Sequence, residues 1–185
     1  MIDLVVKLGG ALLTSERALD HAARAVQDAA AQVRLVVVPG GGPFADAVRA
    51  ADRMHSLGDD AAHWMAVLAM DQYAHLLAAR IRRARIVDRR DAIEAALIAR
   101  HVPVLAPYQW LRAVDPLPHS WDVTSDSIAA WLAGALGARR LALVKRARGA
   151  PRELVDSYFE RVLPAGMSVA CLSADDVSAP TLLAS

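Results

Sequence analysis

The sequence predicts an α/β fold with a mostly parallel central sheet that helices cover on both faces. Short runs rich in β-branched residues alternate with helical segments along the whole chain, and this alternation is typical of parallel sheets. The runs are apolar almost throughout, as expected of strands that are buried on both faces. We expect one domain, residues 1–185, because the chain shows no linker, internal repeat or low-complexity segment.

Each expected strand is a short apolar run bounded by a turn. The first two, within Asp3–Gly10 and Arg34–Gly42, end in consecutive glycines. The other expected strands are Ala84–Asp88, Val102–Pro107, Arg140–Lys145 and Ser168–Leu172. Ligands of open parallel sheets bind at the carboxyl ends of the strands, so both glycine turns fall where a site is expected.

The expected helices lie between these strands and carry apolar residues at helical spacing. Thr14 and Ser15 are candidate N-caps of the first helix, and Pro43 occupies a favoured first-turn position of the second. Gly58 separates the second helix from a long third one, at about Asp60–Arg82. The remaining expected helices are Asp91–Arg100, a segment from near Asp126 to Gly137, and a segment near Leu154–Leu163.

Composition and charge exclude several classes of protein. The net charge of +1 provides no basic surface for nucleic acid or an anionic membrane. No apolar run approaches the ~18 residues of a membrane span, and the N-terminus lacks a signal-peptide pattern. A single cysteine, Cys171, allows neither an internal disulfide nor a cysteine metal cluster. We therefore expect a cytoplasmic protein without nucleic-acid or membrane partners.

The first glycine turn contains the first candidate site residues. Lys7 stands one residue inside the strand end, and Gly9 and Gly10 follow. Glycines let the backbone approach a ligand closely, and a lysine supplies a point charge suited to phosphate. The alternative is a lysine that extends to water beside an ordinary turn.

The second turn places Gly40, Gly41 and Gly42 between a buried strand and a helix N-terminus, a position that favours an anion. The same letters fit a loose dinucleotide fingerprint, G-x-G-x-x-A. That fingerprint expects an acid ~20 residues on, whereas the next strand-end acid is Asp88. A dinucleotide site and a ligand-free structural turn are the minor alternatives.

The stretch "PHSWDVTSDS" is the third candidate. Thr124 or Ser125 can cap the helix that follows, and Asp126 suits the helix dipole in its first turn. His119 and Trp121 could simply pack the loop. Beside two glycine turns at neighbouring strand ends, however, this junction would complete a pocket for phosphates. Such a pocket suits phosphoryl transfer, which depends mainly on positioning and charge stabilisation.

Three segments, "VVKLGG", "VVVPGGGPFADAVR" and "HSWDVTSDSIAAWLA", resemble the amino acid kinase superfamily from Met1 to about Lys145, and the rest of the chain resembles it loosely. The pattern is most similar to the kinases of methanofuran biosynthesis, which convert an aminomethylfuran-methyl phosphate to the diphosphate. The resemblance implies a three-layer αβα sandwich, a homodimer or larger homo-oligomer, and a small phosphate-bearing acceptor. It also implies ATP as phosphoryl donor, with Mg²⁺ held chiefly through the nucleotide phosphates and no metal-binding side chain.

The resemblance further assigns roles to the candidate residues. Lys7 would contact the transferred phosphoryl group, and Asp126 would position that lysine. The nucleotide-binding set is Gly9, Gly10, Ser125, Lys145 and Gly149. The acceptor-binding set is Gly40, Gly41, Gly42, His119, Trp121 and Thr124.

One segment differs from the superfamily pattern. Relatives usually carry an acidic "T-D-V-D-G-V-Y"-like segment after the fifth strand, whereas this chain has "VKRARGAPREL". Lys145 stands where some uridylate-type relatives also carry a lysine. The alternative to a kinase is therefore a non-catalytic ligand-binding, storage or structural subunit of the same fold.

Overall fold

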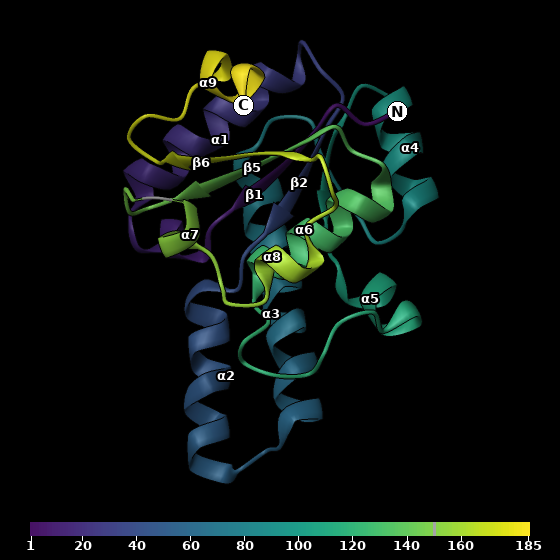
Figure 1. Ribbon diagram of the computed structural model, residues 1–185. Helices are drawn as coiled ribbons and strands as arrows, with labels where there is room; N and C mark the ends of the chain where they lie inside the picture. The colour runs from purple at the N-terminus through teal and green to yellow at the C-terminus, as the bar shows by residue number, and fades with distance from the viewer. Residues whose placement is uncertain (150) are drawn as a thin grey trace.

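The computed structural model describes residues 1–149 and 151–185, whose strands form one six-stranded sheet between layers of helices (Figure 1). The strands are β1 (Leu4–Leu8), β2 (Leu35–Pro39), β3 (Ala84–Val87), β4 (Val102–Leu105), β5 (Arg140–Lys145) and β6 (Ser168–Ser173). Their order is β3-β4-β2-β1-β5-β6, and every pairing among them is parallel. The predicted three-layer αβα architecture is confirmed, and the carboxyl ends of the strands share one edge.

Strand β1 lies in the middle of the sheet, and its side chains alternate between the two cores. Leu4, Val6 and Leu8 pack into one core, whereas Val5 packs into the other. This alternation follows from the two-residue period of a strand. It places Lys7 on the same face as Val5, the face that the second core covers.

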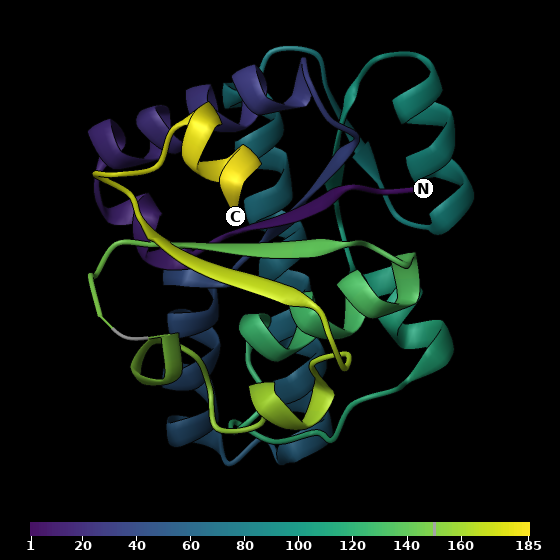
Figure 2. The ribbon, with the colours of Figure 1, turned by 45° about the horizontal axis from the view of Figure 1, so that its top comes forward.

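Helices cover both faces of the sheet. On one face lie α1 (Glu16–Ala30), α9 (Ala179–Ala184) and the later part of α3, and Figure 2 shows α9 beside α1. On the other face lie α4 (Arg90–Ile98), α6 (Ser125–Leu136) and α8 (Phe159–Val162). The predicted C-terminus of α6 is confirmed, because Gly137 adopts the left-handed conformation that ends it (φ 64°).

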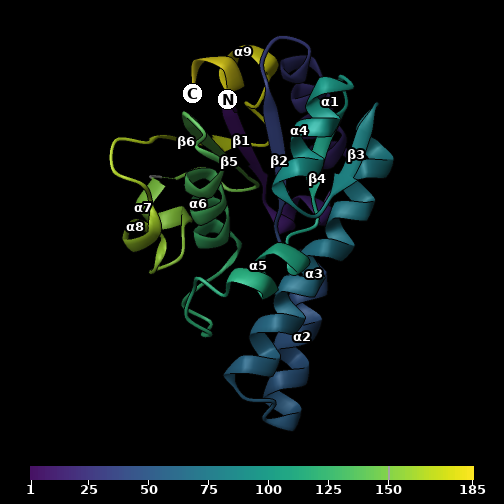
Figure 3. The same ribbon diagram turned by 90° about the vertical axis from the view of Figure 1, so that its right-hand side faces the viewer.

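Helices α2 (Gly42–His55) and α3 (Asp59–Arg80) form an antiparallel pair that extends beyond the carboxyl edge of the sheet (Figures 1 and 3). Helix α2 starts directly after the glycine turn of β2. Helix α3 runs back toward the sheet, where Tyr73 and Leu77 are fully buried. The hairpin therefore forms one wall of any site at the strand ends.

Several short elements differ from the sequence-based expectations. A 3₁₀ helix, η1 (Gly10–Thr14), follows β1, and α5 (Tyr108–Val114) follows β4; neither they nor α9 were predicted. The single helix expected near Leu154–Leu163 is wrong: the chain forms α7 (Pro151–Leu154) and α8, separated by a turn. In that turn the Asp156 carboxylate accepts a hydrogen bond from the Tyr158 N–H and binds the start of α6, which fixes the bend.

No helix in the described residues is long and apolar enough to cross a membrane.

Candidate active site

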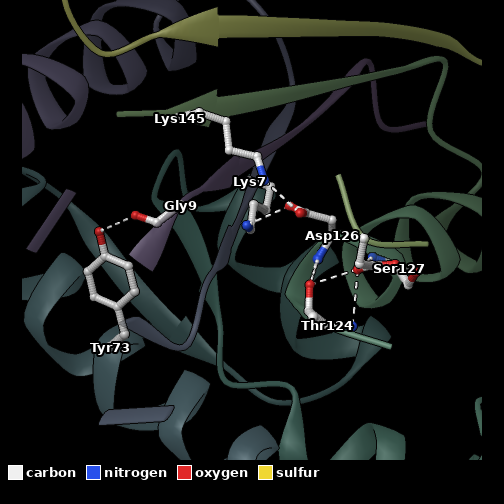
Figure 4. Close-up of polar contacts among 8 residues, drawn as sticks. Lys7, Gly9, Tyr73, Thr124, Asp126, Ser127 and Lys145 are labelled. Atoms are coloured by element: carbon white, nitrogen blue, oxygen red, sulfur yellow. Dashed lines mark hydrogen bonds and ion pairs between the residues drawn. The ribbon is translucent and has the colours of Figure 1, made fainter. Parts of the chain in front are cut away.

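Two lysines share one buried carboxylate at the carboxyl edge of the sheet (Figure 4). Lys7 Nζ donates to Asp126 Oδ1 at 2.6 Å, and Lys145 Nζ donates to Asp126 Oδ2 at 2.6 Å. The lysines come from the adjacent strands β1 and β5, and Asp126 comes from the first turn of α6. The cluster holds two positive charges and one negative charge, and an anion would balance it.

Burial and charge compete in setting the pKa values of this cluster. Burial alone would raise the pKa of Asp126, but the charges of Lys7 and Lys145 and their hydrogen bonds outweigh it and lower that pKa. Burial and the neighbouring charge of Lys7 lower the pKa of Lys145, against the opposing effect of Asp126. Asp126 is therefore ionised at neutral pH, and Lys145 loses its proton more readily than an ordinary lysine.

The two glycine turns touch each other beside this cluster. A Cβ atom on Gly10 would lie 2.0 Å from the Gly42 nitrogen, and one on Gly40 would lie 2.6 Å from the Gly10 nitrogen. Gly42 also has a positive φ of 56°. Only glycine allows the two backbones to approach this closely.

The glycines of these turns divide into two kinds. The Gly9 N–H donates to the Val144 carbonyl at 2.9 Å and the Gly40 N–H donates to the Leu8 carbonyl at 2.8 Å. These two N–H groups extend the sheet, so any ligand contact of Gly9 and Gly40 stays a prediction. By contrast, η1 and α2 begin at Gly10 and Gly42, and the first N–H groups of a helix lack an acceptor within it.

Tyr73 supports the first turn from below. Its hydroxyl donates to the Gly9 carbonyl at 3.5 Å (Figure 4), and burial raises the pKa of this phenol. The side chain is fully buried. It therefore stays protonated and available as a donor at all ordinary pH values.

The start of α6 is held by Asp156, a residue that the sequence analysis did not single out. Its carboxylate accepts from the Thr124 N–H at 3.0 Å, the Thr124 hydroxyl at 2.7 Å, the Ser127 N–H at 3.1 Å and the Ser127 hydroxyl. Thr124 in turn caps the helix by accepting from the Asp126 N–H at 3.5 Å. Of the two predicted caps, Thr124 is the one used.

A cavity of about 310 Å³ lies between the glycine turns, the α2–α3 hairpin and the start of α6. Its lining includes six of the predicted site residues: Gly10, Gly41, Gly42, Trp121, Thr124 and Ser125. Two of them, Gly10 and Ser125, were assigned to the nucleotide. The other walls are mostly apolar side chains of α3, such as Val67 and Met70.

Trp121 and His119 have different environments. Trp121 lines the cavity, donates from Nε1 to Asp52 at 2.9 Å, and lies under the Arg49 guanidinium at 4.7 Å. His119 is not among the lining residues. Its ring contacts Asp60 at 2.6 Å and Asp115 at 2.8 Å, so it ties the loop to the start of α3.

The protonated form of His119 is favoured in this tether. Burial opposes protonation, but hydrogen bonds to Asp60 and Asp115 outweigh it and raise the pKa of His119. The His119 ring stacks on His63 with centroids 4.2 Å apart. Burial and the charge of His119 lower the pKa of His63 to about 4. His119 thus holds a proton more readily than an ordinary histidine, and it lies on a His63 ring that is neutral at neutral pH.

Gly149 lies in the loop after β5, where an added Cβ would meet Leu154 at 3.3 Å; it does not line the cavity. In the same loop, Arg146 reaches back to the Thr14 hydroxyl of η1 at 3.1 Å. Arg49, Arg146 and Asp156 are site neighbours that no sequence pattern indicated. The sequences around the two arginines, "VRA" and "VKR", contain no motif that would have indicated a position near the site.

No group of three or more His, Cys, Asp or Glu side chains in the described part of the chain is arranged to hold a metal ion. Asp126 is committed to two lysines.

The amino acid kinase family model matches residues 4–149, a span that contains both glycine turns, Asp126 and Lys145. The chain belongs to the amino acid kinase family. A similar curated protein is the [5-(aminomethyl)furan-3-yl]methyl phosphate kinase of Methanocaldococcus jannaschii, 25% identical over 179 residues that cover 96% of this chain and 77% of the relative. The predicted family is confirmed, and with it a kinase.

Solved structures of the same fold include three nucleotide kinases. Uridylate kinase from Archaeoglobus fulgidus has a TM-score of 0.62 at 19% identity and covers 85% of this chain and 70% of its own. UMP kinase from Ureaplasma parvum has a TM-score of 0.69 at 13% identity, and the match covers 95% of this chain and 91% of the Ureaplasma chain. UMP kinase from Bacillus anthracis has a TM-score of 0.69 at 12% identity, and the match covers 99% of this chain and 92% of the Bacillus chain. At these low sequence identities, the similarity to the three structures shows that this amino acid kinase family member shares their fold.

Proposed function

We propose that this kinase transfers the γ-phosphoryl group of ATP to a small acceptor that already carries a phosphate. The observation that carries the proposal is the Lys7–Asp126–Lys145 cluster beside the two touching glycine turns. Two ammonium groups that share one carboxylate supply net positive charge where a transferred phosphoryl group needs it.

The acceptor that we propose is [5-(aminomethyl)furan-3-yl]methyl phosphate, as in methanofuran-type cofactor synthesis. Its support is the named relative and the cavity beside the cluster, whose volume of about 310 Å³ suits a small ring compound. Apolar side chains along α3, including Val67 and Met70, would face the ring. The glycine turns would hold the phosphate end.

In the proposed reaction an oxygen of the acceptor phosphate attacks the γ-phosphorus of ATP. A new P–O bond forms while the bond from the γ-phosphorus to the β-bridging oxygen breaks, so ADP leaves and the acceptor becomes a diphosphate. A phosphate monoester is largely ionised at neutral pH, with a second pKa of about 6. No general base is needed, which fits an Asp126 that is occupied by two lysines.

The residues of this chain position and stabilise the reacting groups. Asp126 orients Lys7 and Lys145, and their ammonium groups offset charge on the transferred phosphoryl group. The N–H groups of Gly10 and Gly42 would bind phosphate oxygens at two helix starts. Bound Mg²⁺ would neutralise charge on the nucleotide phosphates.

We place the nucleotide on the β5 side of the cluster, near Lys145, Ser125 and Gly149. The support is electrostatic: Arg146 adds a cation there and already reaches across to Thr14. The basic segment after β5 thus provides charge that can bind phosphates directly, without the acidic segment of relatives. ATP is the nucleotide that this proposal requires.

We also propose that the kinase is a cytoplasmic homo-oligomer. Met65 and Leu68, three residues apart on α3, are 37% and 41% exposed, and large exposed apolar side chains on one helix favour self-association. A single cysteine fits a reducing compartment. Light scattering tests the assembly: a mass of one chain at micromolar concentration would rule it out.

The direct test of function is ADP release with the furan phosphate and Mg-ATP. We expect acceptor-dependent ADP formation, and we expect Mg-ATP to raise the melting temperature, because a ligand that binds only the native state stabilises it. If Mg-ATP in large excess does not stabilise the protein, the non-catalytic alternative is favoured instead.

A further inference from the structure

The cavity beside the active site has two electrically different ends. At the sheet edge the lining includes the glycine turns and Ser125, the chain neighbour of Asp126. The Lys7–Asp126–Lys145 cluster does not itself line the cavity; it lies beside this end and needs an anion for balance. The other end lies between α2 and α3. Along α3, Asp59 and Met70 both line the cavity and stand about 16 Å apart at the rise of an α-helix, so the far end is remote from the transferred phosphoryl group.

Two of the polar side chains at the far end, Arg49 and His63, already have a partner or no charge. Arg49 donates to Asp46 at 2.9 Å and lies over Trp121, so its charge is compensated. Burial and the neighbouring charge of His119 hold the pKa of His63 at about 4, so His63 is neutral. Asp59, in contrast, has no ion pair or hydrogen bond to its carboxylate among the described residues.

His63 also indicates that a ligand binds at the α2–α3 end of the cavity. It is only 9% exposed and lines the cavity, and in the described part of the chain it makes ring contacts but no hydrogen bond. No sealed and unpartnered side-chain nitrogen exists among the described residues, so the imidazole nitrogens of His63 keep access to the cavity. A neutral imidazole offers one donor and one acceptor.

Asp59 and His63 are four residues apart on α3, so they share one face of the helix one turn apart. A carboxylate and a neutral imidazole nitrogen are both acceptors. A primary ammonium group has three donors and one positive charge, and it would satisfy both acceptors at once. An anion at this end would instead meet the Asp59 carboxylate.

We propose that the α2–α3 end of the cavity binds a primary ammonium group of the acceptor through the Asp59 carboxylate and a ring nitrogen of His63. This inference rests on the proposed function and extends it. The acceptor class is a small compound with a phosphate at one end, an apolar ring in the middle and a primary amine at the other end.

The test compares two acceptors that differ only at the amine: [5-(aminomethyl)furan-3-yl]methyl phosphate and (5-methylfuran-3-yl)methyl phosphate. With wild-type enzyme and saturating Mg-ATP, we expect kcat/KM to favour the amine by about 10- to 100-fold, the range of a charged hydrogen bond. In Asp59→Asn and His63→Phe, which remove the charge and the ring acceptor respectively, that preference should fall through a higher KM for the amine, with kcat unchanged. Turnover of the methyl compound should not change.

Asp91→Asn is the matched control. Asp91 is also a first-turn acid of a helix, so its removal costs the same kind of dipole interaction. Its substitution also weakens an exposed pair with Arg89, but Asp91 lies outside this cavity. We expect its amine preference to equal that of the wild type. Because Asp59 is exposed, Asp59→Asn tests the inference even if the His63 variant folds poorly.

The outcomes separate the two proposals. Equal kcat/KM for both acceptors in the wild type, or an unchanged preference in Asp59→Asn, would overturn the ammonium site while the kinase function stands. No ADP from either acceptor would overturn the proposed acceptor, and the ammonium site with it.

Discussion

Lys7 and Asp126 are 119 residues apart in the chain, and their side chains meet at 2.6 Å inside the protein. Lys7 is 3% exposed and Asp126 is 4% exposed. The same carboxylate also binds Lys145. Because the charges are buried and each depends on the others, the catalytic proposal makes different predictions for the loss of each partner.

We expect Asp126→Asn to lower kcat by about 100-fold or more, the scale of a lost electrostatic group in an active site. It should also destabilise the fold by about 3–5 kcal/mol, since two buried ammonium groups lose their counter-charge. Lys7→Met should lose as much activity but less stability, because Asp126 keeps Lys145 as its partner. Urea unfolding and steady-state kinetics measure both. A Lys7→Met protein less stable than Asp126→Asn would contradict this account.

The pKa of Lys145 predicts an alkaline limit to activity. Burial and the charge of Lys7 lower this pKa from its ordinary value of 10.5, so Lys145 loses its charge as the pH rises toward that value. We expect kcat to fall on the alkaline side, and Lys145→Arg to shift the fall to higher pH because arginine stays protonated. The test is the profile of kcat from pH 7 to pH 10 for the wild type and Lys145→Arg, with melting temperatures as a folding control. Coinciding profiles would refute the role of the Lys145 charge.

Gly10 should not accept even one extra carbon. A Cβ at Gly10 would lie 2.0 Å from the Gly42 nitrogen, so Gly10→Ala must separate the two turns. We expect a loss of about 2 kcal/mol or more together with loss of turnover. Gly137→Asn is the control, since Gly137 has a left-handed φ of 64° and open space around it, and asparagine tolerates that conformation. Wild-type activity in Gly10→Ala would show that the turns do not hold phosphate.

The His119 tether should stabilise the protein at low pH more than at high pH. Its pKa is raised, so its contribution is fully present below the unfolded value of about 6.5 and is lost as the pH rises through the folded value. His63, Asp60 and Asp115 are the titratable groups around it. We expect the difference in melting temperature between wild type and His119→Asn to be larger at pH 6 than at pH 9, by about 2–4 °C per kcal/mol. A difference independent of pH would disprove the charged tether.

Asp156 should act through the start of α6. Its carboxylate accepts from both Thr124 and Ser127, so Asp156→Asn would place an amide donor against other donors. We expect a loss of about 1–3 kcal/mol and a lower kcat, because Asp126 shifts from its lysines. Asp122→Asn, an exposed acid in the loop that leads into α6, should leave both quantities unchanged. If Asp156→Asn has the kcat of the wild type, Asp156 has no positioning role.

Much of the fold, and the positions of the candidate site residues Lys7 and Lys145, followed from local sequence patterns. All six strands carry β-branched or apolar runs. The two-residue period of β1 already places Lys7 on the face of the sheet opposite to the face of Leu4 and Leu8. The same period places Lys145 of β5 on the same side as Leu141 and Leu143. Their meeting with Asp126 depends in addition on the pairing of β1 with β5 and on the position of the start of α6.

The missed features depend on contacts between distant segments. Asp156 is an ordinary loop acid in the sequence, and only the packing of its turn against α6 makes it a cap. The commitment of the Gly9 and Gly40 N–H groups to the sheet depends on register with Val144 and Leu8. Contacts between distant segments also determine the turn that divides α7 from α8 and the hydrogen bond of His119 to Asp60. No local periodicity of the sequence indicates either feature.

The most direct test of the central proposal is ³¹P nuclear magnetic resonance of the protein with Mg-ATP and [5-(aminomethyl)furan-3-yl]methyl phosphate. The account predicts that the ATP γ-phosphorus signal disappears while ADP and a new pair of coupled diphosphate signals on the acceptor appear, and that Asp126→Asn abolishes this change. ATP that stays intact with this acceptor, or a transfer that persists at the wild-type rate in Asp126→Asn, would contradict it.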